Sequence, residues 1–173
     1  MSILSRLFGG KPDPREDLRP LWHRVVAISR ETHWYADCGV ADTVEGRFDM
    51  ITAVLALVLL RLEGKQELVP SSVFLTELFV EDMDGQLREK GVGDLVVGKH
   101  VGKLMAAMGG RLGAFREALA EDGDAALSAA VERNVNLIDG ANGSKMATAL
   151  RELAARLTAL DDEALLAGAI PDA

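Results

Sequence analysis

The stretch from Met50 to Leu60 reads MITAVLALVLL, and its only polar residue is Thr52. It lies inside a helical pattern that we expect to run from Glu45 to Glu63, and it is apolar around nearly its whole circumference. A helix that water cannot approach from any side lies in the middle of a bundle. The apolar run is also much shorter than the roughly 20 residues that cross a bilayer. We therefore predict a central core helix here.

Helical periodicity continues on both sides of this stretch, whereas strand signals are nearly absent. Apolar residues recur at spacings of three and four in residues 17–31, 71–90, 97–121, 124–135 and 144–160. A breaker, Pro12-Asp13-Pro14, precedes the first of these segments. We predict an all-α protein with a single helical bundle over residues 15–173. Residues 1–14 would be a flexible segment, or an amphipathic helix that lies on a membrane surface or folds back on the bundle.

Composition limits the possible functions. A formal net charge of -8 and a pI near 4.9 argue against a nucleic-acid-binding protein. The single cysteine, Cys38, excludes an internal disulfide and a cysteine-rich metal site, which fits a reducing compartment. The N-terminal residues resemble neither a secretory signal nor a transit peptide. We expect a bacterial cytoplasmic protein, with peripheral attachment to the inner face of the cytoplasmic membrane as the alternative.

Two glycine-containing motifs mark helix boundaries. The first reads GVADTVEGRFD over residues 39–49, and the second reads GVGD over residues 91–94. Gly39 and Gly91 each follow a helical pattern at the position where a left-handed residue closes the last turn. Asp42 lies three residues before Glu45, as in a capping box.

Together with Arg133-Asn134, these motifs resemble the ubiquinol-cytochrome c chaperone family, whose members assist assembly of the cytochrome bc1 complex. The resemblance runs from about Leu18 to Asn134, and the residues after Gly140 resemble nothing that we can name. It implies an assembly factor that binds newly made cytochrome b, or another bc1 subunit. It also implies that the protein is not an enzyme and needs no cofactor.

The resemblance further implies a role in fixing loops beside a client-binding surface for Asp42, Arg47, Asp49, Gly91 and Asp94. Arg47 falls in the first turn of the central helix, where a cation opposes the helix dipole. We therefore expect a specific acidic group to hold it, most simply in an internal salt bridge.

The helix predicted over residues 97–121 has two further faces beside its apolar stripe, one of small residues and one of basic residues. One face carries small residues, among them Gly102 and Gly109, and we favour close internal packing over a partner-binding groove as their explanation. The other face carries Lys99, His100, Lys103 and Arg111, which as a group could dock an acidic loop or lipid headgroups. Both faces supply our candidate client-binding or membrane-facing residues: Lys99, His100, Lys103, Arg111, Gly102 and Gly109.

Two other classes of function remain open. The first is a small metal-dependent enzyme that uses Asp82, Asp84 and His100, and the second is a general helical scaffold with no respiratory role. We favour structural pairing for the carboxylates, because Asp84 and Arg88 have the spacing of a helical ion pair. Cys38 has no neighbouring cation in sequence that would activate its thiol. We accordingly predict no catalytic residue and no metal ligand.

Overall fold

The structure is a computed structural model that describes residues 13–89 and 94–172, with the side chains of residues 94–97 left out of the description. The described residues contain helices and no strand, which confirms the all-α prediction. The helices are α1 (Arg19–Ser29), α2 (Thr32–Ala36), α3 (Val44–Glu63), α4 (Val69–Glu89), α5 (Asp94–Ala120), α6 (Ala125–Asn134), α7 (Ser144–Ala159) and α8 (Asp162–Leu166), with short 3-10 turns at Glu16–Leu18 and Gln66–Leu68.

Helix α3 is the centre of the bundle, as predicted. Every residue from Asp49 to Leu59 is buried, and α1, α4, α5 and α7 all pack against it. The one polar side chain in the apolar run, Thr52, donates its hydroxyl to the carbonyl oxygens of Phe48 and Asp49, so its burial leaves no unsatisfied donor. None of the helices in the described ranges is long and apolar enough to cross a bilayer.

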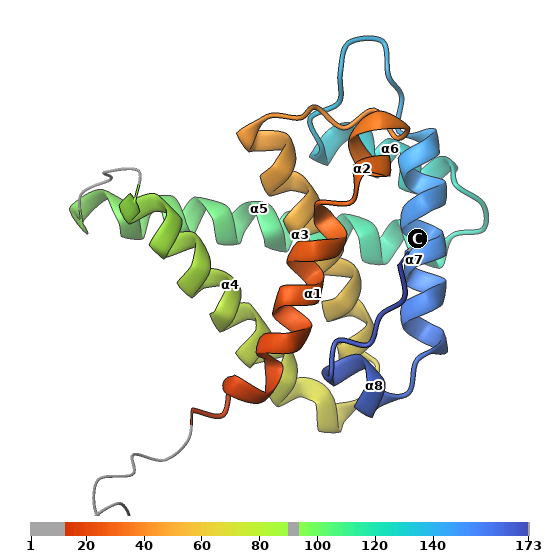
Figure 1. Ribbon diagram of the computed structural model, residues 1–173. Helices are drawn as coiled ribbons and strands as arrows, with labels where there is room; N and C mark the ends of the chain where they lie inside the picture. Colours follow the sequence, from red (N-terminus) through yellow and green to blue (C-terminus); the bar gives the residue numbers. More distant parts are fainter. Residues whose placement is uncertain (1–12, 90–93, 173) are drawn as a thin grey trace, which may run out of the picture.

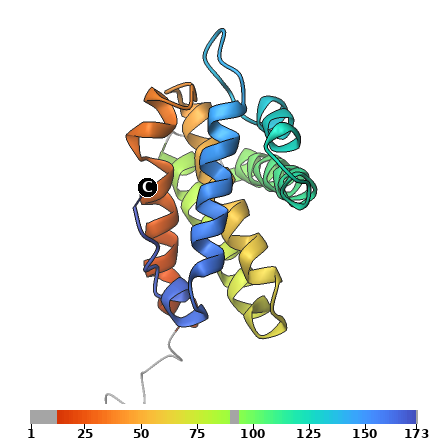
Figure 2. The ribbon, with the colours of Figure 1, turned by 90° about the vertical axis from the view of Figure 1, so that its right-hand side faces the viewer.

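The arrangement is asymmetric around α3. Figure 1 shows α4 and α5 extending together to one side of the molecule, while α7 and α8 cover the other side. In the view turned by 90°, α7 lies along the near face of the bundle (Figure 2). Helices α1 and α4 lie close at the N-terminal end of α1 and diverge toward its C-terminal end (Figure 1). Helices α1 and α5 each contact both α3 and α4, so these four helices form one side of the bundle.

Some helix boundaries differ from the predictions. Thr43, and not Asp42, caps α3, because the Thr43 hydroxyl accepts a hydrogen bond from the Gly46 amide at 3.1 Å. The turn predicted at Gly91 lies outside the described residues. Gly39 has a φ of 76°, which confirms its predicted left-handed conformation.

Candidate functional site

The chain between α2 and α3 is anchored to the connection between α6 and α7. The Ala41 amide donates to the Asn136 carbonyl at 2.9 Å, and the Ile138 amide donates to the Gly39 carbonyl at the same distance. These two bonds flank an isolated antiparallel bridge between Val40 and Leu137. The motif therefore joins two loops that are almost a hundred residues apart in sequence.

The first turn of α3 packs directly against that anchored segment. A Cβ atom on Gly46 would lie 1.9 Å from the Ala41 carbonyl oxygen, which is far inside any allowed contact. Only glycine can occupy this position while the backbone of the loop approaches so closely. Gly46 thus sets the distance between the loop and α3.

An exposed ion pair joins the same loop to the first turn of α3. Arg47 donates through Nε to Asp42 Oδ1 at 2.7 Å, and both side chains are more than half exposed. The hydrogen bond from Arg47 lowers the pKa of the Asp42 carboxyl. The acidic partner that we expected for Arg47 is therefore Asp42.

A buried ion pair lies beneath this loop. Arg111 of α5 is 3% exposed and donates to Asp49 Oδ1 at 2.7 Å, while Asp49 is 6% exposed. Arg111 also donates to the carbonyl oxygens of Asp49 and Asn134. The second carboxylate oxygen of Asp49 accepts from the Asn136 amide at 2.9 Å and from its side-chain amide at 2.6 Å. Burial lowers the pKa of the Arg111 guanidinium, and the negative charge of Asp49 opposes that shift.

This network brings together pieces of sequence that lie far apart. The first motif supplies Asp49, α5 supplies Arg111, and the end of α6 supplies the Asn134 carbonyl. A buried charge needs a partner and satisfied hydrogen bonds, so the network fixes α3, α5 and the α6–α7 connection relative to one another. Asp42, Arg47 and Asp49 each make such contacts at the loop or beneath it, and the loop-fixing role implied for them stays a prediction.

A hollow of about 480 Å³ opens beside the network, between α3, α4 and α5, and we call it the apolar hollow. Half of its lining residues are apolar. They are Val44, Phe48, Ile51, Met83, Leu87 and Leu104. The others are Arg30, Glu45, Arg47, Asp49, Gln86 and Asn136. The buried ion pair therefore supports one side of a cavity with apolar walls and charged groups around them.

The apolar hollow has the chemistry of a protein-binding site. Val44 is 61% exposed, the highest value among the exposed large apolar side chains of the described residues, and Glu45 and Arg47 beside it are exposed charges. An apolar centre with a polar rim is the usual anatomy of a protein interface. The site can bind an apolar segment of a partner and orient it by charge.

The candidate residues of α5 are placed differently from one another. Lys99, Lys103, Gly102 and Gly109 are exposed, and His100 is half-buried. No atom lies within 4 Å of a Cβ built on either glycine. Close internal packing was therefore the wrong explanation for the small-residue face, which is open in the part of the chain that the structure describes.

Arg111 does not belong to the exposed basic face. The helical pattern placed it beside the lysines, but its guanidinium is buried against Asp49. It therefore cannot contact a client or a membrane directly, and its role is to fix the packing of α5 on α3. Asp94 is the first residue of α5, while its side chain and Gly91 lie outside the described residues.

Two carboxylates of α4, those of Asp84 and Glu81, form ion pairs. Arg88 donates to Asp84 at 2.7 Å, which confirms the predicted helical pair, and Glu81 pairs with Arg15 at 2.9 Å. Within the described ranges, no three acidic, histidine or cysteine side chains are grouped to hold a metal ion, so Asp82, Asp84 and His100 form no such site. The Cys38 thiol is buried, which raises its pKa and leaves it a poor nucleophile.

Two functional features escaped the sequence analysis. Asn136 donates two hydrogen bonds to the Asp49 carboxylate, and Arg30 lines the apolar hollow. Apolar periodicity marks neither of these polar residues, and in the structure Arg30 directly follows α1 and Asn136 lies two residues beyond α6. Asn136 lies two residues after Arg133-Asn134, and this proximity was the only signal that could have identified it.

Comparison with known proteins identifies the class. The model of the family "Ubiquinol-cytochrome C chaperone" matches residues 36–172, so this chain belongs to that family. The match includes the segment after Gly140 that the sequence resemblance did not reach. The chain is also similar to the crystal structure of the Cbp3 homolog from Brucella abortus, with a TM-score of 0.79 and 30% sequence identity over 99% of this chain and 97% of that one. No curated protein matches the chain.

Proposed function

We propose that this protein is a non-catalytic assembly factor of the cytochrome bc1 complex that binds newly made cytochrome b. Membership of the ubiquinol-cytochrome c chaperone family supports the assembly role. The observation that carries the binding role is the apolar hollow with its exposed Val44 and charged rim. A binding protein for an apolar client needs such a surface.

The size of the apolar hollow indicates what it binds. A volume of about 480 Å³ accommodates a few side chains and not a whole domain. Burying one Leu or Phe side chain fully contributes roughly 1.5–3 kcal/mol, so a short apolar segment would bind reversibly. Met83 in its wall is an adaptable side chain that can fit clients of different shapes. Reversible binding suits a chaperone that must hand its client to a complex.

The exposed face of α5 forms a second part of the proposed client surface. Lys99 and Lys103 are exposed there, with half-buried His100 beside them and the open Gly102 and Gly109 nearby on the same helix. Single exposed charges contribute little to stability, but a pair of like charges can steer the approach of an acidic partner. In this proposal the lysines accelerate encounter and the hollow retains the client.

The hollow can be tested with two matched valine variants in a strain that lacks the gene. Val44 and Val69 are both exposed and are the first residues of α3 and α4, but only Val44 lines the hollow. We expect the deletion strain to lose bc1 activity and cytochrome b while retaining its transcript. The wild type and Val69→Asp should restore both, and Val44→Asp should restore less than a third of either.

Bc1 activity that is unchanged by the deletion would contradict the proposed function. Full complementation by Val44→Asp would instead be compatible with the assembly function, but it would contradict the proposal that the client binds in the hollow. Circular dichroism of both purified variants serves as the control for folding, because a carboxylate at the first position of a helix is compatible with its dipole.

The lysines can be tested by charge reversal. We expect Lys99→Glu combined with Lys103→Glu to leave the melting temperature within about 2 °C of the wild type, because both residues are exposed. Association with detergent-solubilised cytochrome b should slow by about tenfold at low salt, with the difference shrinking as salt is raised. Stopped-flow or surface-based kinetics measures this directly. An unchanged association rate would make this face an ordinary solvated surface.

A further inference from the structure

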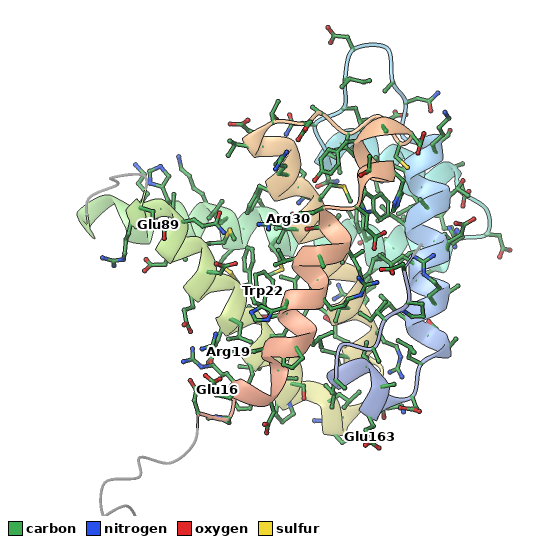
Figure 3. The ribbon with its side chains drawn as sticks, in the orientation of Figure 1. Glu16, Arg19, Trp22, Arg30, Glu89 and Glu163 are labelled. Carbon is green, nitrogen blue, oxygen red and sulfur yellow. The ribbon has the colours of Figure 1, made fainter. Side chains whose placement is uncertain are left out.

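The apolar hollow continues into a second cavity. A groove of about 600 Å³ runs between α1 and α4, with Trp22 and Val26 on one wall and Leu78 on the other. Arg30 and Gln86 line both cavities, so the two meet there. Figure 3 shows Arg19, Trp22 and Arg30 in sequence along α1, with α4 diverging from them toward Glu89. We call the combined cavity the α4 trough.

The helical walls of the α4 trough favour a helical conformation for a bound peptide segment. Its sides are α1 and α4, whose backbone groups are already paired within each helix. An extended segment would find no sheet edge to satisfy its own amides, whereas a helix brings its backbone hydrogen bonds with it. From Arg19 to Arg30 the trough follows α1 for about 16 Å at 1.5 Å per residue, which is three turns of helix. The length of the trough along α1 therefore matches a helix of about three turns.

The charges of the trough do not neutralise one another. Arg30 lies on the α1 side and is exposed, and no described residue forms a hydrogen bond or ion pair with its guanidinium. Asp82 and Glu89 line the α4 side, and neither has a cationic partner among the described residues. By contrast, Arg15 and Arg19 at the narrow end both pair with Glu81. Among the described residues that line the wide part of the trough, Arg30 thus lies unpaired on one side, and Asp82 and Glu89 lie unpaired on the other.

We propose that the α4 trough binds an amphipathic helical segment of the client, with an acidic side chain of that segment paired to Arg30. The apolar face of the segment packs on Trp22, Val26 and the apolar hollow, and a basic side chain faces Asp82 and Glu89. This inference rests on the proposed function, because it names the part of the client that the chaperone holds. A flat bilayer cannot enter a concave trough, and the carboxylates of α4 repel anionic lipid.

The test uses synthetic 15-residue peptides that tile the cytochrome b sequence of the same organism, with binding to the purified full-length protein followed by fluorescence anisotropy. We expect the peptides that bind to be amphipathic helices with at least one Asp or Glu. Arg30→Glu should weaken their binding by tenfold or more. Replacing the peptide's acidic residue with Lys should restore binding to Arg30→Glu and weaken binding to the wild type.

Arg133→Glu is the matched control, because Arg133 is also an exposed arginine without a described partner but lies on α6, outside the trough. Its peptide binding should equal that of the wild type. The proposal is overturned if no peptide binds, if the bound peptides lack acidic residues, or if Arg30→Glu binds them as well as the wild type does. Anionic phospholipid vesicles that displace the peptide would also overturn it, in favour of a membrane site.

Co-isolation of cytochrome b separates this inference from the proposed function. If cytochrome b is recovered equally with the wild type and with Arg30→Glu, the trough is not the binding site and the assembly function stands. If the wild type itself recovers no cytochrome b, both fail. Reduced recovery with Arg30→Glu and normal recovery with Arg133→Glu supports both.

Discussion

Asp49→Ala is expected to lower the free energy of unfolding by about 3–5 kcal/mol, the usual cost of removing one partner from a buried ion pair. The substitution leaves the Arg111 guanidinium, which is 3% exposed, without its carboxylate in a site that water does not reach. It also removes the acceptor for both amide groups of Asn136. Urea denaturation followed by circular dichroism measures the change.

The matched control is Asp42→Ala, which removes the carboxylate of the exposed Asp42–Arg47 pair in the same motif. Both pairs join an Asp to an Arg at 2.7 Å, so they differ mainly in exposure. The exposed pair should contribute less than about 1 kcal/mol. Equal effects of the two substitutions would mean that burial does not govern the Asp49 pair.

The two-residue variant Asp49→Leu with Arg111→Met provides a second check. Replacing both charged partners by apolar side chains removes the stranded charge, so it should be less destabilising than Asp49→Ala alone. If it remains well folded but binds cytochrome b poorly, the polar network positions the hollow and does more than hold the helices together.

The central helix could be predicted because its environment is uniform along its length. Every side of α3 between Met50 and Leu59 meets protein, so a stretch whose only polar residue is Thr52 has only one explanation in a chain of this size. Two other features were predictable for a similar reason: the ion pair between Asp84 and Arg88, and the left-handed conformation of Gly39. Each depends on neighbours within a few residues.

The burial of Arg111 could not be predicted, because the environment of α5 changes along the helix. Lys103 and Arg111 are two helical turns apart on one side, and a helical pattern assigns them the same surroundings. In the structure Lys103 is exposed, whereas Arg111 reaches Asp49 of α3 and the end of α6. Which turns of a long helix meet a neighbour is set by the tertiary arrangement and leaves no periodic signal.

The surroundings of the glycines could not be predicted from the helical pattern either. Gly102 and Gly109 looked like close-packing positions because they share one face, but that face is open. Gly46 attracted attention only as part of the family motif, and it makes the closest backbone approach of the glycines in the described chain. The reason lies in the carbonyl of Ala41, whose position follows from the bridge to residues 136–138.

Gly46→Ala is therefore expected to be among the most damaging single substitutions, with a loss of about 3 kcal/mol or more in the free energy of unfolding. The added methyl group would lie 1.9 Å from the Ala41 carbonyl oxygen and 3.0 Å from its carbon. Both are backbone atoms. The Ala41 amide donates a hydrogen bond to the Asn136 carbonyl, and the Ala41 carbonyl accepts one from the Thr43 amide. The loop cannot move aside without losing these bonds.

Gly102→Ala is the matched control, since it makes the same chemical change within another helix. Its added methyl meets nothing within 4 Å, so the higher helix propensity of alanine should raise the free energy of unfolding by up to about 1 kcal/mol. The same substitution should thus have opposite signs at the two positions, which thermal and urea denaturation can resolve. If Gly46→Ala were as stable as the wild type, the loop would have to leave α3 at little cost, and Asn136 would lose its hydrogen bond from the Ala41 amide. Cytochrome b binding by that stable variant would then show whether the anchored loop is needed to form the client site.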